Sequence, residues 1–161
     1  MNNYLVAVLF FLPAGIGNMA PVIANKIPIL NRWNAPLDFG KDWKGKRILG
    51  DNKRWRGVVF GTLLAGLSAM LISTLQNDVV YSAHPFILGC ALGFGALFGD
   101  GVESFFKRLK GLKPGQSWFP FDQLDYIVGG LLFVYPFARL PINDMVTMII
   151  VDFCIHLVSA Y

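Results

Sequence analysis

The sequence has little charge and few of the residues that soluble enzymes use for nucleophilic or zinc chemistry. Charged residues make up 15% of the 161 positions, against about 25% in ordinary soluble domains. Only two histidines occur, His84 and His156, and the two cysteines, Cys90 and Cys154, lie inside apolar runs. The chain therefore offers no Ser-His-Asp arrangement, no cluster suited to zinc and no disulfide framework. It also lacks a phosphate loop of the GxxxxGKS/T kind, which disfavours a P-loop kinase.

Apolar residues dominate instead, and they indicate a membrane protein. Hydrophobic residues are 55% of the chain, and the mean hydropathy is +0.52. The length suits one domain, so residues 1–161 are expected to form a single integral-membrane domain. We predict an all-α, polytopic helical bundle with about five transmembrane helices, because five apolar segments approach the length of a span. These segments are Tyr4–Ala24, Val58–Leu75, Pro85–Gly99, Leu124–Leu140 and Asp144–Tyr161.

The third segment is short for a span and rich in glycine. The spacings Gly89-xxx-Gly93 and Gly95-xxx-Gly99 place small residues where helix backbones can touch, which predicts a central, buried helix. Its start is expected to extend back through Tyr81, or the helix to lie partly inside the bundle. Its end is expected to deliver Asp100 to the membrane surface.

Polar residues interrupt the first and last segments. Asn18 and Asn25 either form hydrogen bonds between helices or line a polar cavity. Asp152 and His156 lie four residues apart, on one helical face. They form a structural pair, lie near the inner surface, or take part in function.

Basic residues predict the orientation. Nine of the 14 Lys and Arg lie between residues 25 and 57, four lie between 100 and 123, and none lies in the loop 76–84. Short loops rich in Lys and Arg remain cytoplasmic, so we expect the N-terminus outside, the C-terminus cytoplasmic and both basic loops on the cytoplasmic face. Attraction to anionic lipid is another reason for basic residues there.

Topology places no demand on carboxylates, so the acids between residues 99 and 125 call for another explanation. Asp100 and Glu103 form one pair three residues apart, and Asp122 and Asp125 form a second. Each pair could cap a helix, or could present both carboxylates in one direction to a cation. Mg²⁺ takes oxygen ligands and shares them with substrate phosphates. Lys107 and Arg108 between the two pairs, with Lys53 and Arg56 from the first loop, could bind such phosphates.

These motifs resemble the CTP-dependent phosphatidate cytidylyltransferases. The resemblance is carried by Gly99-Asp100, Glu103, Ser104-Phe-Phe-Lys107-Arg108, Lys113 and Asp122-Gln-Leu-Asp125, and more weakly by Lys53-Arg-Trp-Arg-Gly57. It covers residues 18 to 142. The short length and the Pro-x-Asp-Gln-Leu-Asp run are most similar to the compact CDP-archaeol synthase branch. Gln123, Pro114 and Arg54 stand where that superfamily has Arg, Asp and Thr.

The resemblance implies transfer of the cytidylyl group of CTP to an isoprenoid glycerol-phosphate lipid, with release of pyrophosphate. It implies Mg²⁺ held by Asp100, Asp122 and Asp125, with Glu103 as a ligand or orienting group. Lys53, Arg56, Lys107 and Arg108 would hold the phosphorylated substrates, and Lys107 would also be catalytic. The two apolar chains would lie between spans, where the glycines of the third helix make room for one. The expected setting is the cell membrane with the active face cytoplasmic, and no nucleic acid is expected as a partner.

Three other functions remain open at the sequence level. A related CTP-dependent polyprenol or phytol kinase would release CDP from CTP. A small transporter would place charges near the bilayer midplane. A non-catalytic scaffold would only bind anionic lipid.

Overall fold

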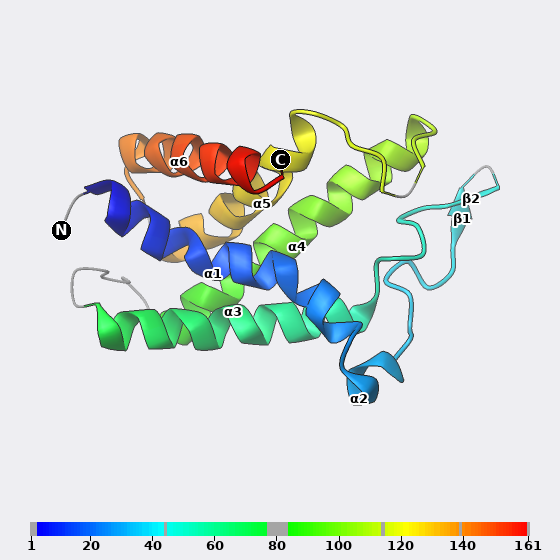
Figure 1. The fold of residues 1–161 in the computed structure, drawn as a ribbon, viewed down its shortest axis with the longest axis horizontal. Helices are drawn as coiled ribbons and strands as arrows, with labels where there is room; N and C mark the ends of the chain where they lie inside the picture. Colours follow the sequence, from blue (N-terminus) through cyan, green and yellow to red (C-terminus); the bar gives the residue numbers. More distant parts are fainter. Residues whose placement is uncertain (1–2, 44, 77–83, 114, 139, 161) are drawn as a thin grey trace.

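The fold is described here from a computed structural model, which describes residues 3–43, 45–76, 84–113, 115–138 and 140–160. Helices dominate the described residues, and the only strands among them form a small antiparallel hairpin in which Asp42 pairs with Arg47 (Figure 1). In chain order the elements are α1 (Asn3–Ala24), α2 (Pro28–Asn31), β1 (Asp42–Trp43), β2 (Lys46–Arg47), α3 (Trp55–Leu75), α4 (Pro85–Leu109), α5 (Phe121–Ala138) and α6 (Ile142–Ala160).

The expectation of a helical membrane protein is confirmed. Among the described residues, three helices are long and apolar enough to cross a membrane: Tyr4–Ala24, Trp55–Leu75 and Pro85–Leu109. α5 and α6 coincide with the fourth and fifth apolar segments of the sequence, with 18 and 19 residues. Five spans and the orientation of the termini remain predictions.

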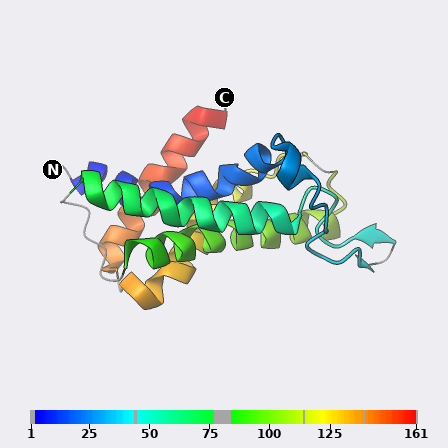
Figure 2. The ribbon, with the colours of Figure 1, turned by 90° about the horizontal axis from the view of Figure 1, so that it is seen from below.

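α4 is the central helix of the bundle, as its glycines predicted. It packs against α1, α3 and α5, while α6 contacts α1 and α5 and is tilted away from the other long helices (Figure 2). Gly89 and Gly93 face α3, where an added Cβ would overlap atoms of Ala65. Gly95 and Gly99 face α5, so the two glycine pairs serve two different helix contacts.

These close contacts explain most of the glycines of α4, because neighbouring helix backbones fill the space beside them. Gly99 also lines an apolar groove between α4 and α5, and the expectation that the glycines make room for a lipid chain stays a prediction. A Cβ added at Gly95 or Gly99 would overlap the backbone carbonyl of Gly129 or Asp125 on α5. Small residues here stabilise the bundle through close packing of backbones, as is common between helices in membranes.

α4 is also longer than predicted, and Asp100 does not close it. The helix continues for nine residues beyond Asp100 to Leu109, with Lys110 as its C-cap and Gly111 at a φ of +77°. The sequence explains why the helix continues, because no proline interrupts residues 101–109 and apolar residues recur at helical spacing there. α4 begins at Pro85 with His84 as its N-cap; the proposed extension through Tyr81 falls outside the described residues.

The segment between α2 and α3 is held together by polar contacts rather than by a core. Asp38 is buried and pairs with Arg47, and its carboxylate also accepts hydrogen bonds from the N–H groups of Gly40 and Leu49. Burial alone would raise the pKa of Asp38, but Arg47 and the two N–H donors lower it overall. The hairpin extends beyond the helix ends (Figure 1).

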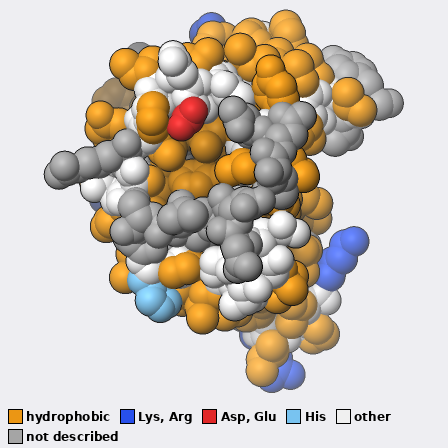
Figure 3. All heavy atoms as spheres, turned by 90° about the vertical axis from the view of Figure 1, so that its left-hand side faces the viewer, with side chains coloured by type: hydrophobic (Ala, Val, Ile, Leu, Met, Phe, Trp, Pro, Cys, Tyr) orange, Lys and Arg blue, Asp and Glu red, His pale blue; other side chains and the backbone are white. Residues whose placement is uncertain are grey.

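The two ends of the bundle differ in character. The end that bears the N-terminus is mainly hydrophobic on the face shown in Figure 3, where acidic side chains occupy one small area and Lys and Arg side chains lie only at the margin. The basic segment with the hairpin lies at the other end (Figure 1). This separation agrees with the charge pattern from which the orientation was predicted.

Candidate active site

Three acidic side chains from α4 and α5 come together inside the bundle. Asp100, Glu103 and Asp125 each place a carboxylate oxygen within 4.8 Å of the other two. Glu103 is buried, whereas Asp100 and Asp125 are partly exposed. This oxygen cluster is the centre of the candidate site.

The close crossing of α4 and α5 explains how the oxygen cluster forms. Gly99 lies against the backbone carbonyl of Asp125, and Gly129 lies against Gly95 and Gly99. Because no Cβ separates the helices there, the residue after Gly99 and the side chain of Asp125 can share one small volume. Glu103 follows Asp100 by three residues, which puts it on the same side of α4.

Asp122 lies beside this cluster with a different partner. Its carboxylate pairs with the ammonium of Lys107 and accepts a hydrogen bond from the N–H of Trp118 at 2.7 Å. Lys107 also pairs with Glu103, with 2.8 Å between Nζ and Oε1. Lys107 therefore bridges Glu103 and Asp122. The group of three carboxylates contains Glu103 together with Asp100 and Asp125, and the predicted metal role of Asp122 stays a prediction.

Lys53 reaches the cluster from the segment before α3. Its ammonium pairs with the carboxylate of Asp100, 47 residues away in the sequence. This contact brings the first basic loop into direct contact with the acidic region of α4. Both side chains are roughly three-quarters buried, with 22% and 27% of their surfaces exposed.

The donor set of the cluster fits a hard divalent cation. All three groups offer carboxylate oxygens, which Mg²⁺ prefers. Among the described residues, four acids, Asp100, Glu103, Asp122 and Asp125, meet two lysines, Lys53 and Lys107. If all four acids are ionised, two negative charges remain, which one divalent cation would neutralise. Holding such charges without a partner inside a membrane protein is costly.

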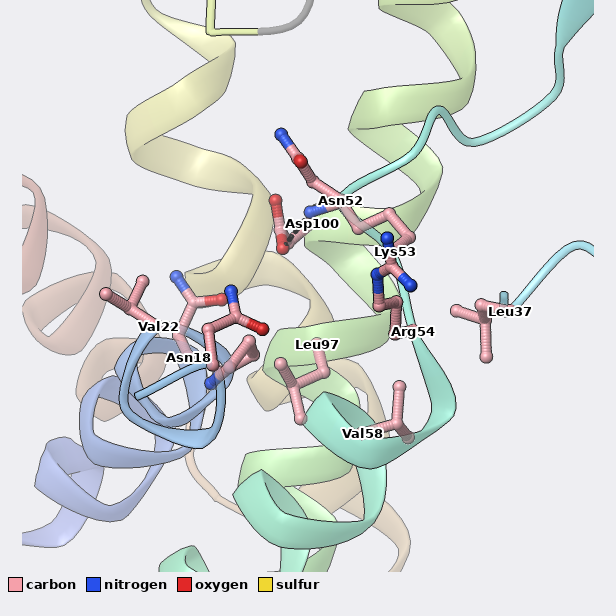
Figure 4. Close-up of a pocket in the computed structure, with 11 residues that line it drawn as sticks. Asn18, Val22, Leu37, Asn52, Lys53, Arg54, Val58, Leu97 and Asp100 are labelled. Atoms are coloured by element: carbon pink, nitrogen blue, oxygen red, sulfur yellow. Dashed lines mark hydrogen bonds and ion pairs between the residues drawn. The ribbon is translucent and has the colours of Figure 1, made fainter. Parts of the chain in front are cut away.

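A polar pocket opens on the Asp100 side of the cluster (Figure 4). It encloses about 330 Å³ between α1, the segment before α3, and α4. Asn18, Asn52, Lys53, Arg54 and Asp100 supply its principal polar groups, and Pro21, Val22, Leu37, Val58 and Leu97 supply apolar walls. Asn18 and Asn25 both line this pocket, so the cavity alternative for these two asparagines is confirmed.

An apolar groove opens on another side of the cluster, between α4 and α5. Its volume is about 590 Å³. Glu103 and Asp125 line it together with Phe98, Gly99, Val102, Phe106, Trp118, Phe121, Leu124, Val128, Gly129 and Leu132. The groove and the polar pocket share no lining residue, so the oxygen cluster lies between two openings of opposite polarity.

Arg56 and Arg108, which were predicted to bind phosphate, contact other parts of the protein in the structure, and their phosphate role stays a prediction. The guanidinium of Arg56 donates to Asn25 Oδ1 at 2.8 Å and 3.2 Å, to Asn34 Oδ1 and to the carbonyls of Asn31 and Trp33, and only 5% of the residue is exposed. These contacts make Arg56 a clamp between the end of α1 and the following loop. Arg108 donates to the carbonyl of Lys113 at 3.2 Å. Neither residue contacts the oxygen cluster in these bonds.

Asp152 and His156 lie on α6, apart from the residues that line the pocket and the groove. Asp152 is buried, and the His156 ring lies 5.5 Å from the ring of Tyr126 on α5. The two residues therefore belong to the contact between α5 and α6.

Asn52 and Arg54 in the pocket, and Trp118 and Phe121 in the groove, were not singled out as site residues. The sequence did contain part of the pattern that marks the groove. Phe98, Val102 and Phe106 recur every fourth residue on α4, which is the spacing of one helical face. The fold alone reveals that this face lies beside the acids.

Comparison with known proteins supports the same family as the sequence motifs. The family model described as CarS-like, CDP-archaeol synthase, matches residues 1–161. A CDP-archaeol synthase of Pyrococcus furiosus is 33% identical over 162 residues, which cover 97% of this chain and 90% of that protein. One from Methanococcus maripaludis is 38% identical, with 95% and 87% covered.

A solved structure agrees with the fold. It is that of an intramembrane enzyme for archaeal membrane lipid biosynthesis, with a TM-score of 0.79 and 27% sequence identity, covering 96% of this chain and 92% of that one. The family model covers the whole chain, and relatives above 30% identity match nearly all of it. The chain belongs to the CDP-archaeol synthase family of membrane enzymes.

Proposed function

We propose that this chain transfers the cytidylyl group of CTP to a lipid phosphate of the 2,3-bis-O-geranylgeranylglycerol 1-phosphate type, forming a CDP-lipid and pyrophosphate. The names of the relatives support this reaction class. One geometric observation is the main structural support for the proposal. A cluster of carboxylate oxygens lies between a polar pocket with cationic groups and an apolar groove.

The two openings fit the two reactants. The polar pocket, with Lys53 and Arg54 in its wall, suits a nucleotide that carries a charged triphosphate. The groove between α4 and α5 suits an apolar lipid chain, with the lipid phosphate at the end where Glu103 and Asp125 lie. This arrangement brings the two phosphates to the oxygen cluster from different sides, as an in-line displacement requires.

In the proposed reaction an oxygen of the lipid phosphate attacks the α-phosphorus of CTP. The bond from that phosphorus to the oxygen bridging to the β-phosphorus breaks, and pyrophosphate leaves with the electron pair. No proton has to be removed from an ionised phosphate oxygen, so the chain needs no strong base. Positioning and charge stabilisation then supply most of the catalysis, as in other phosphoryl transfers.

Each charged residue of the site has a task in this scheme. Asp100, Glu103 and Asp125 would hold Mg²⁺, with Asp122 in place for a further contact. A bound Mg²⁺ supplies Lewis-acid stabilisation of charge on the phosphates. Lys53 and Lys107 would exchange part of their contact with the acids for substrate phosphate oxygens. Five spans with the polar pocket facing the cytoplasm would give the nucleotide direct access.

The decisive experiment uses the purified full chain, CTP labelled at the α-phosphate, Mg²⁺ and a panel of lipid phosphates. We expect label in the lipid product and an equal amount of pyrophosphate. The panel compares ether-linked isoprenoid chains with ester-linked acyl chains. A parallel reaction with a polyprenol in place of the lipid phosphate tests the kinase alternative, which predicts release of CDP and a phosphorylated polyprenol. Absence of any CTP turnover would contradict the proposal.

A further inference from the structure

We infer that α2 is a membrane-surface anchor, which places Ile29 and Trp33 in the lipid headgroup region and so holds the segment that carries Lys53 in position. The partner is the surface of the bilayer that surrounds the bundle. The anchoring stands on its own observations, whereas the effect on Lys53 rests on the proposed function, in which Lys53 binds the nucleotide.

The position of α2 puts it at a membrane boundary. α1 and α3 are both long and apolar enough to cross a membrane, and α2 follows α1 after residues 25–27. In both ribbon views α2 lies level with the ends of α1 and α3, whereas the hairpin extends further along the helix axes (Figure 1 and Figure 2). We therefore expect α2 at the depth where the spans leave the lipid, and the hairpin in the aqueous phase.

α2 presents exposed apolar side chains at this depth. None of its residues is buried, and Ile29 is 74% exposed. Trp33 follows four residues later, which is the spacing of one helical face, and it is 45% exposed. The N–H of Trp33 donates to the carbonyl of Leu30 at 3.0 Å, so the chain keeps turning as far as Trp33. A tryptophan beside an exposed aliphatic residue is typical of the interface between lipid and water.

The charges of this stretch suit a lipid surface. No Asp or Glu occurs between residues 25 and 37, so no side chain here repels anionic headgroups. Arg32 is exposed at the end of α2, and a cation near the surface is attracted to anionic lipid. Charge complementarity therefore favours the lipid headgroups as the partner of α2.

Arg56 ties α2 to the start of α3. Its guanidinium donates to the carbonyl of Asn31 at 2.9 Å and to the carbonyl of Trp33 at 3.3 Å. These bonds fix the backbone of α2 while leaving the side chain of Ile29 exposed. Movement of α2 is therefore passed to the segment that leads into α3.

Backbone hydrogen bonds continue from there to Lys53. Residues 35–37 run antiparallel to residues 53–55. The N–H of Leu37 donates to the carbonyl of Lys53 at 2.9 Å, and the N–H of Trp55 donates to the carbonyl of Ala35 at 3.1 Å. The Lys53 side chain pairs with Asp100 of the oxygen cluster. An α2 fixed on the bilayer would therefore restrain the backbone that presents Lys53 to the nucleotide.

The test of anchoring compares Trp33 with Trp43 of β1, which is 59% exposed but lies on the hairpin. The purified full chain is placed in vesicles of phosphatidylcholine and phosphatidylglycerol that carry bromine near the headgroup end of the acyl chains, where it quenches nearby tryptophans. Trp33→Phe should lower the quenched fraction of the fluorescence, because it removes a quenched emitter. Trp43→Phe should raise this fraction, because it removes an emitter that the bromine does not reach. An unchanged or higher quenched fraction in Trp33→Phe would overturn the anchor.

The effect on Lys53 is tested by equilibrium binding of CTP with Mg²⁺ in unbrominated vesicles. Ile29→Glu puts a charge on the face that meets the lipid and should weaken CTP binding about two- to tenfold, the usual effect of ordering one side chain. Trp43→Glu on the hairpin is the matched control and should bind CTP as the wild type does. Equal CTP binding by Ile29→Glu and the wild type would overturn the link between α2 and Lys53.

Failure of the proposed function is recognised separately. The quenching measurement needs no nucleotide, and lipid product and pyrophosphate are measured on the wild type in the same vesicles. Thermal unfolding of Ile29→Glu should match that of the wild type in detergent, because the Ile29 side chain is exposed. If this variant unfolds early, the quenching by Trp33 still decides whether α2 lies in the lipid surface.

Discussion

At the scale of single residues, the site depends on how four acids divide their contacts. Asp100, Glu103 and Asp125 share a small volume, whereas Asp122 is held by Lys107 and by the N–H of Trp118. Sequence spacing alone treats Asp122 and Asp125 as equivalent, since both point the same way from one helix. Their different partners in the structure predict different effects when each is altered.

Asp125→Asn should lower turnover about 100-fold or more and raise the Mg²⁺ concentration needed for activity, because it removes an oxygen ligand from the cluster. Asp122→Asn should lower turnover about 10- to 100-fold, the usual cost of losing a group that supports a ligand, with little change in the Mg²⁺ requirement. Steady-state assays across a Mg²⁺ titration measure both quantities. Asp144→Asn, at the exposed start of α6, is the control. Equal Mg²⁺ curves for the Asp125 variant and the wild type would contradict the ligand role.

Lys107 gives a second prediction at this scale. It bridges Glu103 and Asp122 with only 13% of its side chain exposed, so it both neutralises the acids and lies near the expected phosphates. Lys107→Met keeps much of the volume but removes the charge, and it should raise the KM for CTP about tenfold or more. Lys26→Met, at an exposed lysine of the first loop, should leave this KM unchanged. Equal CTP titrations for the Lys107 variant and the wild type would show that Lys107 only supports the fold.

At the scale of helices, the contact between α4 and α5 decides whether the oxygen cluster exists. Gly99 faces the Asp125 carbonyl so closely that an added methyl group would force the helices apart, whereas a Cβ at Gly101 meets no atom within 4 Å. Gly99→Ala should therefore lower the thermal stability and strongly reduce activity. Gly101→Ala should leave activity near the wild-type value and should keep or slightly raise the thermal stability, because alanine has a better helix propensity than glycine.

Two measurements compare Gly99→Ala with Gly101→Ala. Thermal unfolding of the detergent-solubilised proteins reports on packing, and turnover at saturating Mg²⁺ reports on the site. The expected outcome is a lower Tm for Gly99→Ala than for Gly101→Ala, together with the loss of activity. If the two variants behave alike, the close crossing is not what assembles the cluster.

The same helices show how far the sequence could predict the fold. The five apolar segments correspond to α1, α3, α4, α5 and α6, and the glycine spacing predicted a central α4 with close backbones. The end of α4 was missed because apolarity stops near Gly99, whereas helical structure does not depend on apolarity and persists to Leu109. The roles of Asp122 and Glu103 could not be separated either. Their different contacts depend on the rotation of α4 against α5, which no local pattern encodes.

At the scale of the whole molecule, the feature that matters is the separation of two openings by one cluster of acids. Lys53 belongs to the polar pocket and Val128 to the apolar groove, and the lining residues of the two do not overlap. This arrangement was not predictable from the sequence, because it joins the segment before α3 to the ends of two helices far along the chain. With the nucleotide in the pocket and the lipid in the groove, as we propose, both reactants would be bound together in a ternary complex.

Filling the groove tests that implication. Val128 is 53% exposed on the wall of the groove, so Val128→Trp should occupy part of the space of a lipid chain. We expect a KM for the lipid phosphate at least about fivefold higher, with CTP binding unchanged, since burial of chain methylene groups is lost without any change in the polar pocket. Ile150→Trp on α6, at a site of 57% exposure outside the groove, controls for adding a tryptophan to an exposed helix face. If Val128→Trp instead weakens CTP binding and leaves the lipid KM as it was, the reactants have been assigned to the wrong openings.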